Sequence, residues 1–312
     1  MGAASAAPSI TMTAPAPECP YIGRFAPSPS GPLHFGSLAS AVASYLDAKA
    51  HNGTWLVRMD DLDPPREIPG AADLILQQLQ QHSLNWDGEV LYQSQRSEVY
   101  LATLEKLQHE GLVYPCQCSR QQLKEQGGIH HNRCQLKDPS APRALRLAAP
   151  VQSQIEFNDI FQGPQNQNIK HEVGDVVLHR KDGFFAYQLA VVVDDAFQQI
   201  SHVIRGSDLL NSTPRQICLQ QLLGLPTPQY GHIPVVTNLK GQKLSKQNLT
   251  PSIDAKTASA NLTSALQWLG LPLPKALYSA SGHELLNWGV EYWQRKLIPS
   301  VMEKVTFNQQ LR

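Results

Sequence analysis

Apolar residues near the N-terminus follow two patterns, one typical of buried strands and one typical of helices. The runs from Tyr21 to Ala26 and from Thr54 to Met59 are short and apolar, which favours a buried strand at each place. Between them, one face of a helix is predicted by apolar residues three or four apart: Leu38, Ala41, Val42, Tyr45 and Leu46. Strand, helix and strand within about forty residues make a βαβ unit, so we expect the α/β class with a doubly wound parallel sheet.

The rest of the chain continues this alternation around a polar, irregular interval. Helices are predicted at two apolar stripes (Leu74, Ile75 and Leu79; Tyr100, Leu104 and Leu107) and over Pro214–Leu223, Ala258–Leu269 and Glu284–Gln294; strands are predicted over Asp175–Leu178 and His232–Val236. We expect an insertion at residues 116–185 between two halves of the sheet, residues 21–115 and 186–250, followed by a short helical C-terminal region at residues 251–312.

Composition narrows the class of protein. The 312 residues carry a formal net charge of zero, which argues against indiscriminate binding to nucleic acid but not against a local basic face. No apolar run is long enough to span a bilayer, and residues 1–20 read as a disordered tail without the features of a signal peptide. Five cysteines, three of them clustered, suit a reducing compartment, so we expect a cytoplasmic protein. Nothing demands a partner subunit, so we expect a monomer.

A loop rich in proline separates the first strand from the first helix. Three prolines and a glycine between Pro27 and Pro32 forbid both helix and ladder pairing there. Strand, loop and helix in this order present free backbone N–H groups and the positive end of a helix dipole, which is an arrangement for binding phosphate. The loop lacks the lysine and the glycine spacing of a P-loop. At the helix start stands His34, which by itself also suits a capping or core histidine.

The string His34-Phe35-Gly36-Ser37 resembles the HIGH motif of class I aminoacyl-tRNA synthetases. The longer string RFAPSPSGPLHFG resembles their glutamate-specific branch. This resemblance implies that His34 donates to phosphate oxygens of ATP and that Gly36 lets the nucleotide approach the backbone. It also implies that glutamate is bound by the residues at the end of the first strand: Arg24, Phe25, Ala26, Pro27 and Ser28.

Three further blocks resemble the same branch and extend the implied glutamate site. The segment after the second strand resembles a family motif whose first acid holds the amino group of glutamate; here it is Asp60, one methylene shorter than the usual Glu. Tyr187 matches the family tyrosine that contacts glutamate. Arg205 matches the arginine that can grip the side-chain carboxylate bidentately, so we take it as the specificity residue.

The segment Lys243-Leu244-Ser245-Lys246-Gln247 resembles the KMSKS loop of the same family. Two lysines around a serine are by themselves typical of a surface loop, but this one follows His34 by 212 residues. The resemblance implies that His34, Lys243 and Lys246 are catalytic and that Lys246 helps to bind ATP, neutralising the charge that grows on the α-phosphate. Mg²⁺ is expected to accompany ATP, with no ligand that the sequence identifies.

Cysteines and histidines in the insertion have the inventory of a structural zinc site. Cys116, Cys118 and Cys134 supply three thiolates, with His130 or His131 as the fourth ligand, although unpaired thiols are the other interpretation. The glutamyl-queuosine branch of the family carries zinc at this point, commonly with a tyrosine in the position of His130, so the resemblance favours His130. With four protein ligands, such a zinc ion has no open position for chemistry.

The resemblance is strong from Tyr21 to Lys246 and leaves no room after it for a large anticodon-binding region. It implies a Rossmann-like doubly wound sheet with a zinc-bearing α+β insertion. It also implies an enzyme that activates glutamate with ATP and transfers it to queuosine in the anticodon of tRNA(Asp). Two alternatives are a minimal synthetase that charges the 3′ end of tRNA(Glu) and a paralogue that binds tRNA without catalysis.

Overall fold

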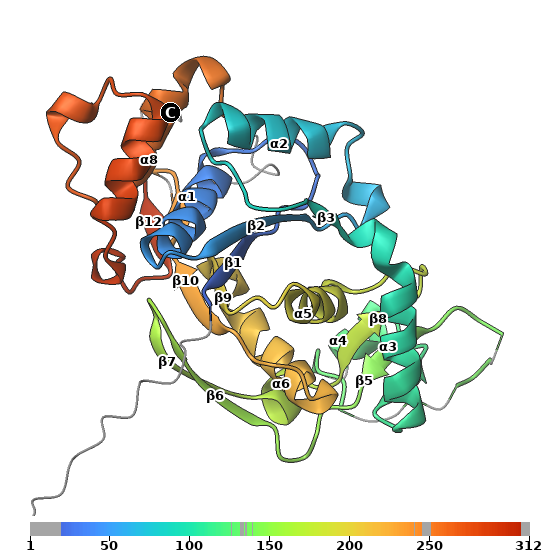
Figure 1. The fold of residues 1–312 in the computed structure, drawn as a ribbon. Coiled ribbons are helices and arrows are strands. Elements are labelled where there is room, and N and C mark those ends of the chain that lie inside the picture. The colour runs from blue at the N-terminus through green and yellow to red at the C-terminus, as the bar shows by residue number, and fades with distance from the viewer. Residues whose placement is uncertain are drawn as a thin grey trace, which may run out of the picture.

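A central sheet of five parallel strands has the order β10-β9-β1-β2-β3 in the computed structural model (Figure 1). The structure describes residues 20–306, apart from residues 126, 132, 133, 135, 139, 240 and 245–250. The five strands are β1 (Ile22–Phe25), β2 (Thr54–Met59), β3 (Leu91–Tyr92), β9 (His202–Gly206) and β10 (Gln229–Ile233). The chain winds outward from β1 in both directions, which confirms the doubly wound sheet and puts its switch point between β1 and β9.

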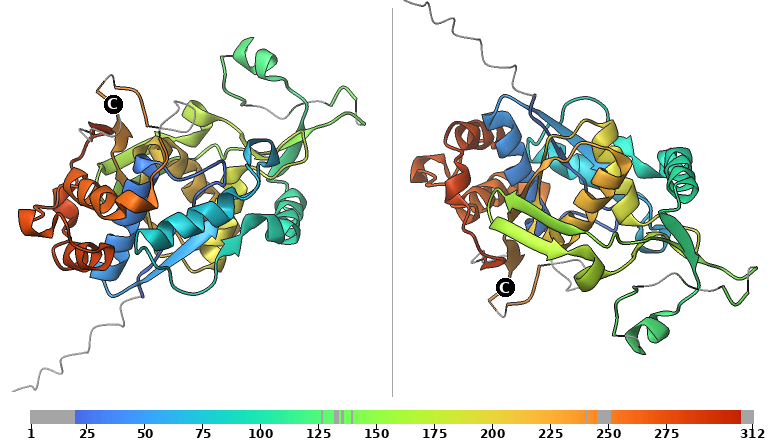
Figure 2. Two further views of the ribbon diagram at one scale, coloured as in Figure 1. Left: turned by 90° about the horizontal axis from the view of Figure 1, so that it is seen from above. Right: turned by 90° about the horizontal axis from the view of Figure 1, so that it is seen from below.

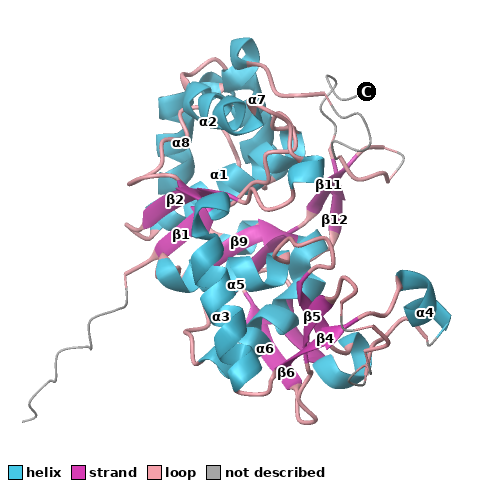
Figure 3. Ribbon diagram, turned by 90° about the vertical axis from the view of Figure 1, so that its right-hand side faces the viewer, coloured by secondary structure: helices cyan, strands magenta, loops and turns pink. Residues whose placement is uncertain are grey.

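Helices cover both faces of this sheet (Figure 3). One face carries α1 (Phe35–Ala50), α2 (Ala71–Gln81), α7 (Ala258–Trp268) and α8 (Gly282–Glu291); the other carries α3 (Ser97–His109), α5 (Tyr187–Phe197) and α6 (Thr213–Leu223). Helix α1 packs against the strands with one face and against α7 and α8 with another. This explains why Leu38, Val42 and Leu46 are wholly buried. Strands covered on both sides must be apolar runs, which is the pattern of β1 and β2.

The insertion forms a second, antiparallel unit. Strands β4 (Val113–Cys116), β5 (Ala144–Leu147) and β8 (Val176–His179) make a three-stranded sheet in the order β4-β5-β8. A hairpin of β6 (Gln154–Asp159) and β7 (Gly163–Asn168) packs by β6 against α6 and β10. The short helix α4 (Arg120–Glu125) lies at the periphery, as both views of Figure 2 show.

The C-terminal region is tied to the first helix by a buried carboxylate. Asp47 in α1 accepts hydrogen bonds from Tyr21 Oη at 2.5 Å, Trp293 Nε1 at 2.8 Å and Arg295 Nε at 2.8 Å. Burial opposes ionisation of Asp47, but Arg295 and Tyr21 outweigh it and hold its pKa below the usual range. Strand β12 (Glu303–Val305) also returns to pair with β11 (Val235–Thr237). The two predicted C-terminal helices are therefore part of the same core.

Two predictions of detail are wrong. The strand expected over His232–Val236 is divided at Pro234 into β10 and β11, which pair with different neighbours because proline cannot donate to a ladder. In α2, Leu74 is 40% exposed, so of the three residues in the predicted stripe only Ile75 and Leu79 are buried in the core. Within the described residues, no helix is both long and apolar enough to cross a membrane. The predicted tail at residues 1–20 lies, up to residue 19, outside the described residues.

Candidate active site and metal centre

A cavity of about 460 Å³ opens at the carboxyl ends of β1 and β9, beside the switch point of the sheet. Its walls come from β1 and the loop after it, the first turn of α1, the start of α5, β9, and the chain after β10. Ten of the predicted site residues line it: Arg24, Phe25, Ala26, Pro27, Ser28, His34, Gly36, Tyr187, Arg205 and Lys243. Asp60 does not line it, and Lys246 lies outside the described residues.

His34 caps helix α1 and lines the cavity at the same time. Its backbone is extended (φ −111°, ψ 172°), and its Nδ1 accepts from the backbone N–H of Ser37 at 3.3 Å. The first turn of α1 contains no acidic residue, so the positive end of its dipole faces the cavity without a protein counter-charge in that turn. A Cβ at Gly36 would lie 3.1 Å from the ring of His34, so glycine keeps this turn compact. The arrangement suits a bound phosphate.

Arg205 is buried beneath the cavity among neutral partners. Its Nε donates to His232 Nε2 at 2.9 Å, and its Nη1 donates to Tyr187 Oη at 3.1 Å. Its Nη2 donates to Thr213 Oγ1 at 2.7 Å and to Gln216 Oε1 at 2.9 Å. No carboxylate among the described residues forms an ion pair with it. A buried guanidinium without a counter-ion, at the wall of a cavity, is a site for an anionic group.

Arg24 lines the same cavity but is already paired. Its Nε and Nη2 contact the two oxygens of Asp195, at 3.1 and 3.2 Å, and Arg58 Nη1 donates to Asp195 at 2.7 Å. Burial opposes ionisation of Asp195, but the two guanidiniums outweigh it and lower its pKa below the usual range. Arg24 therefore brings position and hydrogen-bond donors to the cavity rather than an uncompensated charge.

Asp60 lies behind the cavity wall. Its carboxylate accepts from Arg58 Nε at 2.8 Å, and its backbone N–H donates to the carbonyl of Pro27 at 3.0 Å. Burial raises the pKa of Asp60, and Arg58 only partly opposes this. The observed contacts anchor the loop that carries Pro27. A contact between Asp60 and the ammonium of glutamate remains a prediction.

Only Lys243 and Leu244 of the KMSKS-like segment are among the described residues, and both line the cavity together with His34. On one side Lys243 forms a strand-like bridge with Thr237, and its Nζ contacts Asp208 at 2.6 Å. On the other side Ser252 bridges to His34, and Ile253 N donates to the carbonyl of Leu33 at 3.0 Å. His34 and the described start of the KMSKS-like segment therefore lie at one cavity, while the catalytic role of Lys246 remains a prediction.

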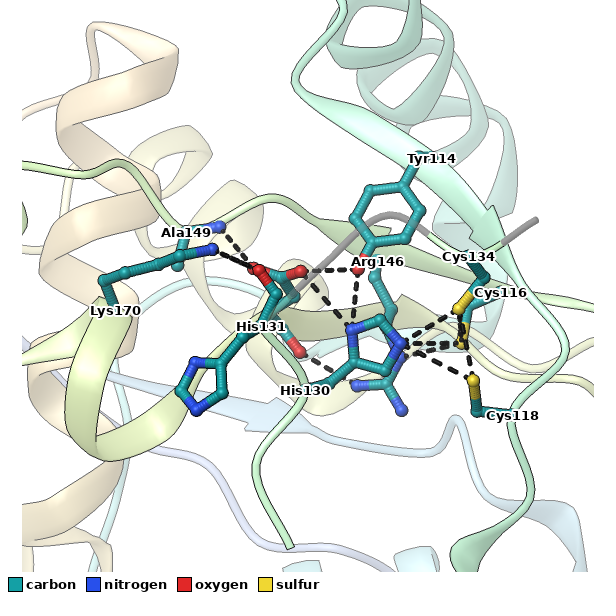
Figure 4. Close-up of polar contacts among 10 residues, drawn as sticks. Tyr114, Cys116, Cys118, His130, His131, Cys134, Arg146, Ala149 and Lys170 are labelled. Atoms are coloured by element: carbon teal, nitrogen blue, oxygen red, sulfur yellow. Dashed lines mark hydrogen bonds and ion pairs between the residues drawn. The ribbon is translucent and has the colours of Figure 1, made fainter. Parts of the chain in front are cut away.

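Cys116, Cys118, His130 and Cys134 converge on one point in the insertion (Figure 4). Their ligand atoms all lie within 4.8 Å of one another. Cys134 Sγ lies 3.3 Å from Cys116 Sγ, 3.2 Å from Cys118 Sγ and 2.9 Å from His130 Nε2. Tetrahedral zinc with Zn–S bonds of about 2.3 Å separates its sulfurs by about 3.8 Å, so these thiols would need to move apart slightly to bind it. The cluster can hold a metal ion.

Groups around the cluster orient His130 and exclude His131. His130 Nδ1 lies 2.9 Å from Tyr114 Oη and 3.4 Å from Asp175 Oδ2, which leaves Nε2 facing the sulfurs. Arg146 Nε donates to Cys116 Sγ at 3.2 Å. The ring of His131 points away from the sulfurs in Figure 4, so the geometry favours His130 of the two alternatives.

Three residues that position the site were missing from the sequence interpretation. Arg58 and Asp195 form the ion-pair cluster behind Arg24, and His232 holds Arg205. A charged residue in an otherwise apolar strand or helix was the available signal for the first two. A histidine in a predicted strand gave no comparable signal.

Comparison with known proteins gives close matches. Residues 22–264 match the family model for tRNA synthetases class I (E and Q), catalytic domain. The glutamyl-Q tRNA(Asp) synthetase of Thiobacillus denitrificans is 52% identical over 287 residues, covering 89% of this chain and 95% of that protein. The protein of the same name from Neisseria meningitidis is 48% identical over 291 residues, covering 89% of this chain and 97% of that protein.

Solved structures with the same fold are more distant in sequence. A glutamate tRNA ligase from Elizabethkingia meningosepticum, crystallised in complex with its amino acid, aligns with a TM-score of 0.76 and 23% identity. The alignment covers 93% of this chain and 68% of that chain. This similarity supports the fold and nothing finer.

Proposed function

The chain belongs to the class I tRNA synthetase family (E and Q) and, within it, to the glutamyl-Q tRNA(Asp) synthetases; on that premise we propose that it activates glutamate with ATP and transfers it to queuosine in the anticodon of tRNA(Asp). The observation that carries the choice of glutamate is Arg205, a buried guanidinium at the cavity wall whose partners among the described residues are all neutral. The side-chain carboxylate of glutamate supplies the missing anion, and Tyr187 and Arg24 line the same cavity.

Activation joins glutamate to the α-phosphate of ATP. One oxygen of the α-carboxylate attacks the α-phosphorus, the bond to pyrophosphate breaks, and glutamyl-adenylate forms. His34 and the N-terminus of α1 bind phosphate oxygens, while Lys243 and Lys246 neutralise the charge that grows as pyrophosphate leaves. Catalysis rests on positioning and charge stabilisation, because the proposed reaction needs no covalent intermediate on the protein.

Transfer then moves the glutamyl group to tRNA. A hydroxyl oxygen of the cyclopentene ring of queuosine attacks the acyl carbon, AMP leaves, and the hydroxyl proton is released. The relatives named glutamyl-Q tRNA(Asp) synthetase are matched over 95% to 97% of their length, which supports this acceptor over the 3′ end of tRNA(Glu).

The Cys₃His cluster would hold a structural zinc ion. Three thiolates and one imidazole at these separations suit Zn²⁺, and four protein ligands leave no open position. The role of this zinc ion would be structural: it would stabilise the insertion. Metal analysis of the purified protein should give one zinc per chain, and chelation should expose the insertion to proteolysis before the central sheet. A metal-free protein with an equally resistant insertion would contradict this assignment.

Transfer of labelled glutamate to two matched tRNA pools tests the function. One pool comes from cells that make queuosine and the other from cells that cannot. We expect ATP-dependent label only in the first pool. Equal label in both would mean charging of the 3′ end of tRNA, and no label without pyrophosphate exchange would favour the paralogue that binds without catalysis.

A further inference from the structure

His232 is the partner that sets the orientation of Arg205. It lies on β10, directly opposite Arg205 in the register between β10 and β9. Its Nε2 accepts from Arg205 Nε at 2.9 Å, so the Nε2 atom must carry a lone pair and no proton. The ring is wholly buried, and no solvent competes for this hydrogen bond.

Asp159 fixes the other ring nitrogen. Asp159 is the last residue of β6, and its Oδ2 lies 2.6 Å from His232 Nδ1. Its Oδ1 accepts from three backbone amides, those of Phe161 at 3.0 Å, Gln162 at 2.9 Å and His232 at 3.0 Å. Both carboxylate oxygens are thus held in place, and Oδ2 can only accept. The proton of the neutral imidazole therefore resides on Nδ1.

The imidazole of His232 is uncharged at neutral pH. Burial lowers the pKa of His232 to about 4, the hydrogen bond to Asp159 opposing and Arg205 assisting. A protonated ring would direct its Nε2–H group at the N–H of Arg205, with only the hydroxyl of Thr213, 3.2 Å from Nε2, as an acceptor. At neutral pH His232 is an acceptor without charge, so it orients the guanidinium without neutralising it.

Counting hydrogen atoms on Arg205 shows what remains for a ligand. Arg205 has five N–H groups. The Nε–H binds His232, and the two N–H groups of Nη2 bind Thr213 and Gln216. Tyr187 accepts from Nη1 at 3.1 Å, which leaves one further N–H on that nitrogen. Since Arg205 and Tyr187 both line the cavity, Nη1 is the nitrogen available to a bound carboxylate.

We propose that Asp159 and His232 are positioning residues for the substrate carboxylate: Asp159 fixes the Nδ1-protonated form of His232, and His232 orients Arg205 while leaving its charge uncompensated. The site thereby selects a carboxylate over the corresponding amide, that is, glutamate over glutamine. This inference rests on the proposed function. It deepens that function by adding two residues that act on the substrate carboxylate through Arg205.

The isosteric variant Asp159→Asn tests the fixed proton position. Its side-chain oxygen can still accept from the three amides, but its NH₂ group then faces His232 and requires a lone pair on Nδ1. The proton moves to Nε2, where it opposes Arg205 Nε–H. In glutamate-dependent ATP–pyrophosphate exchange we expect the KM for glutamate to rise about 10- to 100-fold with the KM for ATP unchanged, since a hydrogen bond to a charged group is lost. The preference for glutamate over glutamine should fall as well.

Two substitutions at His232 separate orientation from general damage. His232→Gln keeps one acceptor and one donor and should raise the KM for glutamate less than about tenfold, whereas His232→Leu should raise it as much as Asp159→Asn. His202→Gln, on the neighbouring strand and away from the cavity wall, is the matched control and should leave both KM values unchanged.

Nitrogen NMR of ¹⁵N-histidine-labelled protein reads the proton position directly, with the His232 signals identified by their loss in His232→Gln. We expect Nδ1 protonated and Nε2 unprotonated at pH 7, and the reverse in Asp159→Asn. A wild-type His232 protonated on Nε2, or an Asp159→Asn protein with unchanged KM for glutamate, would overturn the proposal. Lack of glutamate-dependent exchange in the unsubstituted protein would instead overturn the proposed function.

Discussion

Two buried arginine sites face the same cavity and differ in what surrounds them. Arg24 shares Asp195 with Arg58, whose Nε also contacts Asp60, so two guanidiniums meet two carboxylates. Arg205 meets an imidazole, a phenol, a hydroxyl and an amide, all neutral. Both Arg24 and Arg205 are at least nine-tenths buried, so burial does not distinguish them. The charge of the partners does: the charges of the first cluster are balanced within the protein, and we propose that a ligand balances the charge of the second.

Asp195→Asn should have the largest effect, because it removes the carboxylate that neutralises Arg24 and Arg58. Two buried guanidiniums then lose their shared carboxylate, which we expect to lower the free energy of unfolding by about 3–5 kcal/mol. Denaturant titration of the purified protein measures this. An equal stability of the variant and the wild type would mean that Arg24 and Arg58 do not depend on this carboxylate.

Acid should act on the same cluster with a defined sign. Because the pKa of Asp195 is lowered in the folded state, its stabilising contribution is present above the unfolded-state pKa of about 3.9 and is lost as pH falls through the folded pKa. The Asn variant should lack this part of the acid transition.

Arg205→Leu should separate stability from function. Arg205 is the one arginine lining the cavity that has no carboxylate partner among the described residues, so its loss removes the grip on the substrate carboxylate. We expect about 2–5 kcal/mol less transition-state stabilisation, which lowers kcat/KM for glutamate roughly 30- to several thousand-fold. The free energy of unfolding should change far less than in Asp195→Asn. Glutamate-dependent pyrophosphate exchange and denaturant titration together test this. Retained exchange with unchanged affinity for glutamate would contradict the role assigned to Arg205.

A neutral buried histidine beside Arg205 predicts a loss of stability in mild acid. The pKa of His232 is lowered to about 4 in the folded protein, mainly by burial, against about 6.5 in an unfolded chain. The unfolded state therefore binds more protons in this window, and stability should fall by up to about 3 kcal/mol as pH drops from 6.5 to 4. His232→Gln should flatten the slope of stability against pH over this range. The same slope in both proteins would mean that His232 is not the group that titrates.

How much of this comparison the sequence could predict depends on how local each contact is. Arg205, Tyr187 and the loop after β1 were found because each lies in a recognisable string at the start or end of an element. The tie between His232 and Asp159 joins residues 73 positions apart on different sheets, and no local pattern announces it. Only the tertiary structure brings them together.

Other outcomes follow from side-chain direction. Arg58 and Asp60 are two positions apart at the end of β2, which brings the acid to Arg58 rather than to the cavity. In α5, neighbouring Asp194 and Asp195 point to different partners, Tyr100 and Arg24. Spacing in the sequence identified the Cys/His cluster that could hold a metal ion, but it could not choose between His130 and His131. The structure favours His130, whose ligand atom lies with the three sulfurs.

The weakest expected effect concerns the exposed pair Lys243 and Asp208 at the mouth of the cavity. Their side chains are 45% and 40% exposed, so the pair should contribute about 0–1 kcal/mol to stability, and less at high salt. Asp208→Asn should therefore leave the unfolding free energy almost unchanged. Lys243→Met, in contrast, should raise the KM for ATP, because the phosphates of ATP replace Asp208 as the partner of Lys243.

The two variants together separate a structural ion pair from a ligand-binding lysine. If Asp208→Asn and Lys243→Met lower stability equally and leave the KM for ATP unchanged, Lys243 belongs with the compensated charges, like Arg24. If only Lys243→Met impairs the use of ATP, Lys243 resembles Arg205: its positive charge is neutralised by the bound substrate.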